Sequence, residues 1–371
     1  MRWAAEGIAV AVSDGSSHLS GSKGRDMVRT GAVGVGVIGA GRIGQVHAAN
    51  LARRVKGATL RGVADVRGDA ATTLATRHGV SLSTSDYHDL LADESIEAVV
   101  VASATDTHGE VVRAAAAAGK HVFCEKPIDT TLAAIDASLE AVARAGILFQ
   151  VGFNRRFDPS FRRVRTLVAA GEAGTPHLVR ITSRDPQPPP AGYFTGDLGI
   201  FPDMTIHDFD LARYLVGARP DGDEVVEVFA VASSLVAAAD GGNGEPDTAV
   251  SVLRFASGAV ATIDNSRRAT YGYDQRAEVF GSGGMVSAGN VLEDQAVVAN
   301  GTGIRGAVMQ NFFLQRYADA YADELEAFTA AVRTGAPSPV TGYDGRIAVA
   351  IAIAAQESVR QRRPVRLSEV G

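Results

Sequence analysis

Residues 33–44 read VGVGVIGAGRIG and decide the fold of this chain. An apolar run comes first, glycines punctuate its end, and a helical pattern follows, which predicts a strand, a tight turn and a helix. Two Gly-x-Gly-x-x-Gly matches overlap here, but only the one from Gly39 to Gly44 follows the strand and opens the helix. The stretch therefore predicts the start of a dinucleotide-binding unit whose helix N-terminus faces phosphate groups.

Three glycines and one acidic residue of this unit have separate expected roles. Gly39 would permit the tight turn, Gly41 would let the backbone approach a pyrophosphate, and Gly44 would let the helix pack closely on the strand. Asp65 ends the next apolar run, about twenty residues further on, where an acidic residue binds a ribose hydroxyl; the alternative is an aspartate that only ends a strand. The carboxylate favours NAD, whereas the nearby Arg67 leaves NADP possible.

The first part of the chain alternates between strand and helix patterns, which predicts a right-handed, doubly wound parallel sheet. Each predicted helix is followed by a glycine or a polar turn before the next apolar run. The predicted strands after the first are 58–65, 98–102, 120–124 and 147–153, and the predicted helices are 42–56, 69–78, 86–91, 107–118 and 131–145.

The second part carries strand patterns without helices between them, which predicts an α+β domain with a large, mostly antiparallel sheet. We predict a flexible extension over 1–31, a Rossmann domain over 32–153, and a substrate-binding and oligomerisation domain over 154–371. The closing helix, 345–360, is expected to pack back on the first domain. The predicted strands are 177–183, 225–236, 248–255, 259–265, 276–281 and 284–287, and the helices are 160–170, 203–216, 312–332 and 345–359, with a proline-rich loop at 184–190 and a glycine-rich loop at 238–246.

Composition excludes several classes of protein. The 371 residues have a formal net charge of −6 with both signs spread along the chain, so neither nucleic acid nor a membrane surface is an expected partner. The single cysteine, Cys124, permits no internal disulfide and favours a cytoplasmic location. Residues 13–30 are rich in serine, glycine and charge, which predicts disorder, and we expect Met27 as the native start, with 1–26 as an extension.

Lys126 is the first candidate for chemistry. It lies in Glu125-Lys126-Pro127, directly after a predicted parallel strand, and ligands of doubly wound sheets bind at the carboxyl ends of strands. Pro127 restricts the backbone of Lys126 to an extended conformation and so fixes its direction. Seen alone, an ordinary surface lysine at a strand end is the alternative.

Asp203 and His207 form the second candidate pair. They are four residues apart in a predicted helix and would share one face, so the carboxylate should orient the imidazole and raise its pKa. This arrangement suits a general base. A helix-start aspartate beside a core histidine is the alternative, and a zinc site of His207 with Asp208 or Asp210 is a minor one; we predict no metal, since thiolate-rich sites are excluded and no His-Glu-x-x-His occurs.

A further group of polar residues lies in or beside strands of the second domain. A polyhydroxylated substrate needs many hydrogen-bond donors and acceptors at once, and these side chains offer them, although each alone is typical of a protein surface. The group comprises Asn154, Arg155, Asp185, Tyr271 and Tyr273.

At these motifs the sequence resembles the glucose–fructose oxidoreductase/inositol dehydrogenase/rhizopine-catabolism family over about residues 33–366. The resemblance implies a catalytic trio of Lys126, Asp203 and His207, and substrate contacts from Arg155, Asp185, Tyr273 and the last two members of the trio. The motifs that carry it are GAGRIG, EKP, GFNRRFDPSF, DPQPPP, GIFPDMTIHDFDLARYLVG and QRYADAYADELEAF, and the implied cofactor-binding positions are Gly39, Ala40, Gly41, Arg42, Ile43, Gly44, Asp65, Ser103, Thr105, His108, Glu125 and Lys126.

The resemblance also implies an activity. It is the NAD-dependent oxidation of myo-inositol to 2-keto-myo-inositol, in a homotetramer formed through exposed sheet faces. One departure concerns Ser183, two residues before Asp185, where some family members carry histidine, which leaves the preferred cyclitol open. The alternatives are a dehydrogenase of another cyclitol or sugar (scyllo-inositol, a glucoside or an anhydrosugar) with NAD or NADP, and a non-catalytic nucleotide-sensing regulator on the same fold.

Overall fold

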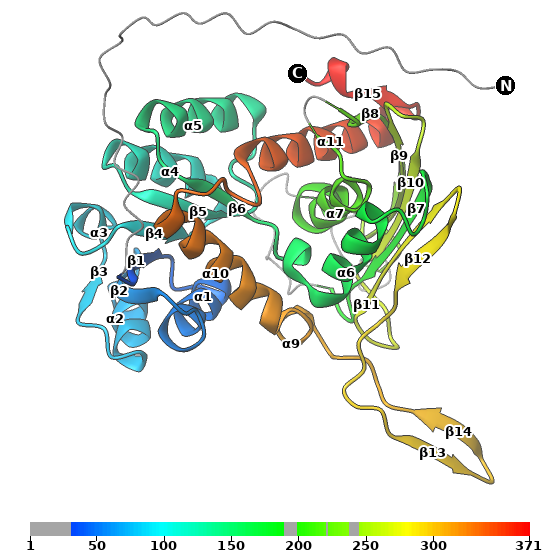
Figure 1. The fold of residues 1–371 in the computed structure, drawn as a ribbon, viewed down its shortest axis with the longest axis horizontal. Helices are drawn as coiled ribbons and strands as arrows, with labels where there is room; N and C mark the ends of the chain where they lie inside the picture. The colour runs from blue at the N-terminus through cyan, green and yellow to red at the C-terminus, as the bar shows by residue number, and fades with distance from the viewer. Residues whose placement is uncertain (1–30, 189–198, 220–221, 237–244) are drawn as a thin grey trace, which may run out of the picture.

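The computed structural model describes residues 31–188, 199–219, 222–236 and 245–371, which form two sheet-based units joined by helices (Figure 1). The predicted extension, including Met27, lies almost entirely outside the described residues, as do most of the glycine-rich loop and the end of the proline-rich loop. In the part that the structure describes, no helix has the length and apolar character needed to cross a membrane.

The first sheet confirms the doubly wound prediction. Its six strands are all parallel and run in the order β3-β2-β1-β4-β5-β6, so the order reverses between β1 and β4. In such sheets this reversal opens the crevice in which a dinucleotide binds. The strands are β1 Val33–Ile38, β2 Ala58–Ala64, β3 Leu82–Thr84, β4 Ala98–Val101, β5 His121–Glu125 and β6 Phe149–Gly152, and the helices are α1 Arg42–Arg53, α2 Gly68–Arg77, α3 His88–Ala92, η1 Thr105–Thr107, α4 His108–Ala117 and α5 Leu132–Ala145.

Alternate side chains of this sheet belong to two separate hydrophobic cores, because successive residues of a strand point to opposite faces of the sheet. On one face, Val100 and Phe123 pack with α1 and with Leu325 and Phe328 of α10, Ala318–Thr334. On the other face, the core is continuous with that of the second unit. Helix α10 thus comes after six of the seven strands of the second sheet in sequence but packs on the first sheet.

The second sheet has seven strands in the order β12-β11-β7-β10-β9-β8-β15. Its neighbours pair antiparallel except for β7 and β10, which are parallel. Helices α6, α7 and α11 lie on the same side of it (Figure 1). The remaining elements are η2 Asn154–Phe157, α6 Pro159–Ala169, β7 Pro176–Arg184, η3 Phe201–Thr205, α7 Ile206–Val216, β8 Val225–Ser233, β9 Thr248–Phe255, β10 Val260–Ser266, β11 Asp274–Gly281, β12 Gly284–Ala288, β13 Val297–Asn300, β14 Gly303–Gly306, α9 Phe313–Arg316, α11 Gly342–Gln361, β15 Val365–Arg366 and η4 Leu367–Glu369.

Helix α11 contacts both units. At Gly345 an added Cβ would lie 2.6 Å from Ile128 and 3.1 Å from Val151, so the glycine permits close approach to the first unit. Further along the helix, the Ser358 hydroxyl accepts a hydrogen bond of 2.9 Å from the Ala230 amide of β8. Helix α11 therefore joins the two units by packing on both of them.

Several elements differ from the predicted ones, and the short strands β3 and β15 were not predicted. The predicted helix 312–332 is divided into α9 and α10 at Tyr317, and the predicted helix 203–216 begins with the wider π turn of η3. The hairpin β13–β14 was not predicted and projects from the molecule (Figure 1). Its strands are only four residues long and fully exposed, so they lack the alternating apolar pattern that identifies a half-buried strand.

Candidate active site

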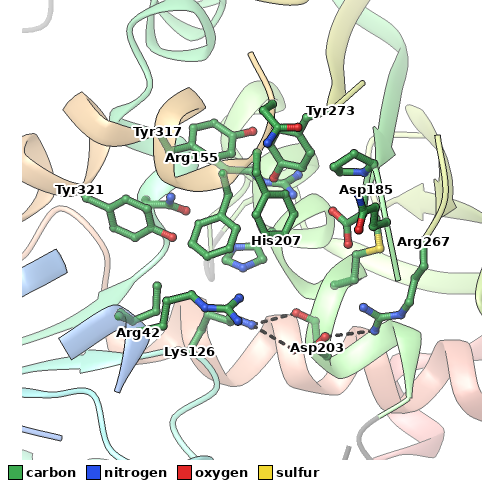
Figure 2. A pocket seen from close by; sticks show the side chains of 18 of the residues that line it. Arg42, Lys126, Arg155, Asp185, Asp203, His207, Arg267, Tyr273, Tyr317 and Tyr321 are labelled. Atoms are coloured by element: carbon green, nitrogen blue, oxygen red, sulfur yellow. Dashed lines mark hydrogen bonds and ion pairs between the residues drawn. The ribbon is translucent and has the colours of Figure 1, made fainter. Parts of the chain in front are cut away.

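A pocket of about 420 Å³ lies between the two units, where the first sheet presents the end of β5 and the second unit presents η2, η3 and the end of β7 (Figure 2). Most of the predicted catalytic and substrate-binding residues line it. The predicted residues among its lining are Arg42, Ile43, Glu125, Lys126, Asn154, Arg155, Asp185, Asp203, His207 and Tyr273.

The glycine turn has the shape that a dinucleotide requires. Gly39 has φ of +106°, and a Cβ there would lie 2.3 Å from the carbonyl oxygen of Ala102. At Gly44 a Cβ would lie 1.8 Å from the Gly39 carbonyl oxygen, so the helix packs directly on the turn. Gly41 differs, because a Cβ there would meet nothing within 4 Å. The open space above Gly41, at a helix start without side-chain cap or acidic first turn, fits a pyrophosphate.

Asp65 is held at the end of the neighbouring strand. Its carboxylate accepts hydrogen bonds from the backbone N–H groups of Ala40 (2.7 Å) and Arg67 (2.9 Å). The side chain of Arg67 lies 3.5 Å from the same carboxylate. This carboxylate beside the turn fits a ribose hydroxyl, and its negative charge disfavours a 2′-phosphate.

Ser103, Thr105 and His108 follow β4 and lie outside the pocket lining. His108 is buried, with Nδ1 2.8 Å from the carbonyl oxygen of Pro127 and Nε2 3.2 Å from that of Ser103. The imidazole thus joins the segment after β4 to the segment after β5, where the peptide bond before Pro127 is cis. Direct cofactor contacts from these three residues stay predictions.

Lys126 and Asp203 meet in the pocket, as Figure 2 shows. The Lys126 ammonium donates a hydrogen bond of 2.8 Å to the backbone carbonyl of Asp203 and lies 3.7 Å from its carboxylate. The other carboxylate oxygen of Asp203 accepts a hydrogen bond of 3.0 Å from Arg267, a buried residue that the sequence analysis missed. Asp203 therefore lies between two cations.

The expectation that Asp203 raises the pKa of His207 is wrong. Burial lowers the pKa of His207 well below its usual value, and the charges of Lys126 and Arg155 lower it further. Its Nδ1 atom is buried and has no hydrogen-bond partner in the described part of the chain. The prediction failed because Asp203 is engaged by Lys126 and Arg267. His207 is consequently neutral at neutral pH, the state in which an imidazole can accept a proton.

Arg155 is fixed by a buried polar network behind the pocket. Its guanidinium donates to the Asp208 carboxylate and, over 3.2 Å, to the Ser183 hydroxyl. Asn265 donates to the same carboxylate over 2.8 Å. Burial opposes the charge of Arg155, but Asp208 outweighs it and holds the pKa of Arg155 above its usual value. Ser183, the position where the chain departs from some family members, thus contacts Arg155 and does not line the pocket.

The remaining polar side chains give the pocket both acceptors and donors. Burial raises the pKa of Asp185 to about 6, although Arg267 and Arg155 oppose the shift. Burial also raises the pKa of Tyr317 to about 12 and that of Tyr273 well above its usual value, so both phenols stay protonated. Tyr271 is half exposed and bonds to Asp274 and Arg184, so it lies outside the pocket that the polar-residue pattern suggested.

The minor zinc alternative at His207 finds no support in the geometry. Asp208 bonds to Arg155 and Asn265, and the Asp210 carboxylate bonds to Arg156 over 2.5 and 2.8 Å. Both carboxylates are therefore engaged by arginine. Sequence reasoning assigned no role to ten described lining residues. Six of them lie in quoted family motifs: Pro186, Gln187 and Pro188 in DPQPPP, Met204 in GIFPDMTIHDFDLARYLVG, and Tyr317 and Tyr321 in QRYADAYADELEAF. The other four, which no quoted motif contains, are Arg267, Asn311, Phe312 and Phe313.

Comparison with known families matches both units. Residues 33–153 match the GFO/IDH/MocA oxidoreductase family with its NAD-binding Rossmann fold, and residues 161–287 match the GFO/IDH/MocA C-terminal domain. The chain belongs to the GFO/IDH/MocA oxidoreductase family. The resemblance noted from the sequence is confirmed, and so is the pairing of a Rossmann domain with a mostly antiparallel α+β domain.

Individual GFO/IDH/MocA relatives align over nearly their whole length. A myo-inositol 2-dehydrogenase of Thermotoga maritima is 48% identical over 336 residues, covering 91% of this chain and 99% of that protein. A scyllo-inositol 2-dehydrogenase (NAD(+)) of Bacillus subtilis is 36% identical over 331 residues, covering 89% and 95%. The crystal structure of a Lactobacillus casei myo-inositol dehydrogenase in complex with NAD(H) and myo-inositol is 27% identical, with a TM-score of 0.82 and coverage of 90% and 96%.

Proposed function

We propose that this chain is an NAD-dependent inositol 2-dehydrogenase that oxidises myo-inositol to 2-keto-myo-inositol. One observation carries the proposal: Lys126 and His207, from different units, line one pocket together with Arg42 and Ile43 of the glycine turn. In this arrangement His207, a proton acceptor, and Lys126, a cation, would face the substrate carbon that lies next to the bound cofactor. Relatives that align along nearly the whole chain are named for this substrate class.

His207 acts as the general base in this proposal. The neutral imidazole removes the proton of the reacting hydroxyl as the carbon–oxygen double bond forms. Lys126 donates a hydrogen bond to the same oxygen and stabilises the negative charge that develops on it. Bound NAD supplies the acceptor for the hydride, so substrate oxidation and cofactor reduction balance.

Asp203 has a different proposed role from the one expected of it. Because it lies between Lys126 and Arg267, its carboxylate holds the ammonium in place and balances its charge. Arg155, Asp185 and Tyr273 bind the other hydroxyls of the ring. Arg155 and Tyr273 donate hydrogen bonds, and ionised Asp185 accepts them, which suits a ring with many hydroxyls.

The alternative is a dehydrogenase of scyllo-inositol or of another cyclitol or sugar, with NAD or NADP. A nucleotide-sensing regulator has less support, because Lys126, Asp203 and His207 are all present and share the pocket. Initial rates over a panel of cyclitols and sugars, each with NAD and NADP, test the proposal. We expect the highest kcat/KM for myo-inositol with NAD; a higher value for scyllo-inositol or a glucoside, or no oxidation of any of them, would contradict it.

Self-association is the second part of the proposal. On the second sheet, Val231 and Val250 are cross-strand partners and are 56% and 50% exposed, and Phe280 and Met285 are partners that are 47% and 54% exposed. Exposed apolar patches of this kind mark protein interfaces. We propose that this face joins copies of the chain into a homotetramer. The cytoplasmic location stays a prediction.

Light scattering coupled to size exclusion tests the assembly. We expect a tetramer for the unaltered chain and smaller species for Val250→Asp, since a buried carboxylate would face apolar side chains in the interface. Thr73→Asp, at an exposed position of α2 in the first unit, checks whether any added charge has the same effect. A stable monomer of the unaltered chain would contradict the proposal.

A further inference from the structure

Three titratable side chains form a buried cluster behind the pocket, on its cofactor side. They are His47 of α1, Glu125 at the end of β5 and Glu324 of α10, and their nearest ligand-type atoms all lie within 4.8 Å of one another. His47 Nε2 is 2.6 Å from Glu125 Oε1. Glu324 is fully buried, and neither oxygen of its carboxyl group has a hydrogen-bond partner among the described residues.

The cluster is connected to the catalytic lysine through Glu125. The second oxygen of this carboxylate accepts a 3.3 Å hydrogen bond from the Lys126 backbone N–H. Lys126 in turn donates to the Asp203 carbonyl, so a short chain of contacts links His47 to the pocket. Glu125 itself lines the pocket, and a Cβ at Gly152 would lie 3.1 Å from its Oε2. The carboxylate therefore has little room to rotate.

Two ionised carboxylates this close in a buried space would repel each other strongly. Burial raises the pKa of Glu324 well above its usual value, and the neighbouring Glu125 charge raises it further. The consistent assignment is an ionised Glu125 that accepts the His47 N–H, beside a neutral Glu324. The packing of the His47 ring edge-on against Phe123 and Tyr321, with centroids 5.2 and 5.9 Å away, limits its motion.

A metal ion is the competing explanation for such a cluster. Ligands of tetrahedral zinc at about 2.1 Å from the metal lie about 3.4 Å apart. The 2.6 Å separation of His47 Nε2 and Glu125 Oε1 is a hydrogen-bond distance and is too short for two ligands of one ion. The geometry therefore favours a hydrogen bond between His47 and Glu125 over a bound metal ion.

We propose that His47, Glu125 and a protonated Glu324 form a positioning unit that fixes the Lys126 backbone, and with it the direction of the catalytic ammonium. The inference rests on the proposed function, because its kinetic consequence needs the oxidation catalysed at Lys126. His47 and Glu324 are positioning residues, since neither lines the pocket. Glu324 contributes shape without adding a second negative charge.

The first test separates the protonation of Glu324 from activity. In the infrared difference spectrum of unaltered protein minus Glu324→Gln at pH 8, we expect the carbonyl stretch of a protonated carboxylic acid. Its absence would overturn the proposal, whether or not the enzyme oxidises inositol. The same variant should keep kcat, KM and the pH profile, because an amide reproduces a neutral carboxyl group in shape and charge. Loss of activity in Glu324→Gln would overturn it as well.

The second test concerns His47. His47→Phe preserves an aromatic ring but removes the hydrogen bond to Glu125, and kcat should fall by about 10- to 100-fold, the effect of losing a bond to a charged group. KM for the polyol should change little, because His47 lies outside the pocket lining and the contacts of the pocket with the substrate remain.

Thr329→Val is the matched control on α10, where the buried hydroxyl bonds only to backbone carbonyls of its own helix. It should lower the melting temperature without lowering kcat. If His47→Phe behaved in the same way, its role would be purely structural and the proposal would fail. Metal analysis of the purified protein completes the test, since one equivalent of tightly bound ion that is lost in His47→Phe would also overturn it.

Discussion

The proposed cofactor wall is the turn of residues 39–44, of which Arg42 and Ile43 line the pocket, and the proposed substrate wall is formed by Arg155, Asp185, Asp203 and His207. The cofactor wall is made within one turn, and its shape comes from backbone contacts such as that between Gly39 and Gly44. The substrate wall depends on side chains far apart in sequence: Arg155 reaches Asp208, 53 residues on, and Arg267 reaches Asp203 from 64 residues away.

The difference determines how each wall responds to substitution. Apart from Arg42, the cofactor wall is uncharged, and its glycines act by leaving space, because a side chain at Gly39, Gly41 or Gly44 would place atoms where backbone or cofactor must lie. The substrate wall depends on charge, because Asp203 is paired with Lys126 and Arg267, and Asp208 behind it with Arg155 and Asn265. Substitutions on the first wall should alter cofactor affinity, and substitutions on the second should alter chemistry and pH dependence.

His207→Ala is expected to have the largest effect and tests whether chemistry resides on the substrate wall alone. Loss of a general base should lower kcat by ~10²–10⁴-fold. The affinity for NADH, measured by fluorescence titration, should be unchanged because His207 is not part of the cofactor wall. His88→Ala, at an exposed position on α3, is the control and should retain full activity. Unchanged kcat in His207→Ala would refute the proposed mechanism.

The same contrast explains which parts of the site could be predicted. The glycine turn, Asp65 and five of the six parallel strands of the first sheet depend on local spacing, so their sequence patterns sufficed to predict them. The strand β3 was missed because three half-buried residues carry no periodic signal. Lys126 was found since it follows a strongly apolar strand and precedes a proline.

Long-range pairing could not be predicted in the same way. Arg267 lies just after β10, and nothing near it in sequence indicates that it bonds to Asp203 in a turn more than sixty residues earlier. The predicted direction of the His207 pKa shift was wrong for the same reason. Spacing predicted a carboxylate partner that would raise the pKa, whereas burial and the charges of Lys126 and Arg155 lower it. Tertiary contacts thus decided the electrostatics, although sequence had identified the residues.

Gly41→Val sharpens the comparison on the cofactor wall and has the second largest expected effect. The position is open in the protein, so the fold should tolerate the side chain, but the valine would occupy the space assigned to the pyrophosphate. We expect the dissociation constant for NADH to rise at least about tenfold, a loss of about 1.4 kcal/mol.

Gly44→Ala is the matched comparison for that variant. Its Cβ would lie 1.8 Å from the Gly39 carbonyl oxygen, so it should lower the melting temperature as well as weaken binding. If Gly41→Val bound NADH normally while remaining folded, the pyrophosphate could not lie against Gly41. The cofactor wall would then need a different assignment.

Asp185→Asn tests the substrate wall and should have the smallest effect. With a pKa of about 6, Asp185 is ionised above that pH and can accept hydrogen bonds from substrate hydroxyls. The pH profile of kcat/KM, which reports the free enzyme, should therefore rise through about pH 6 in the unaltered chain and lose that step in Asp185→Asn.

The stability of the same variant gives an independent check that folding raises the pKa of Asp185. A folded-state pKa above the unfolded value means that protonated Asp185 favours folding at low pH, and that this contribution disappears as pH rises through about 6. Relative to the unaltered chain, Asp185→Asn should thus gain stability above pH 6 and gain none well below it, as measured by denaturant unfolding across that range. His207 cannot produce the same step in activity, because its pKa is lowered well below 6.5. If Asp185→Asn still showed a step in activity near pH 6, the step would have to come from another group. The pH dependence of the substrate wall could then not be assigned to the Asp185 carboxylate.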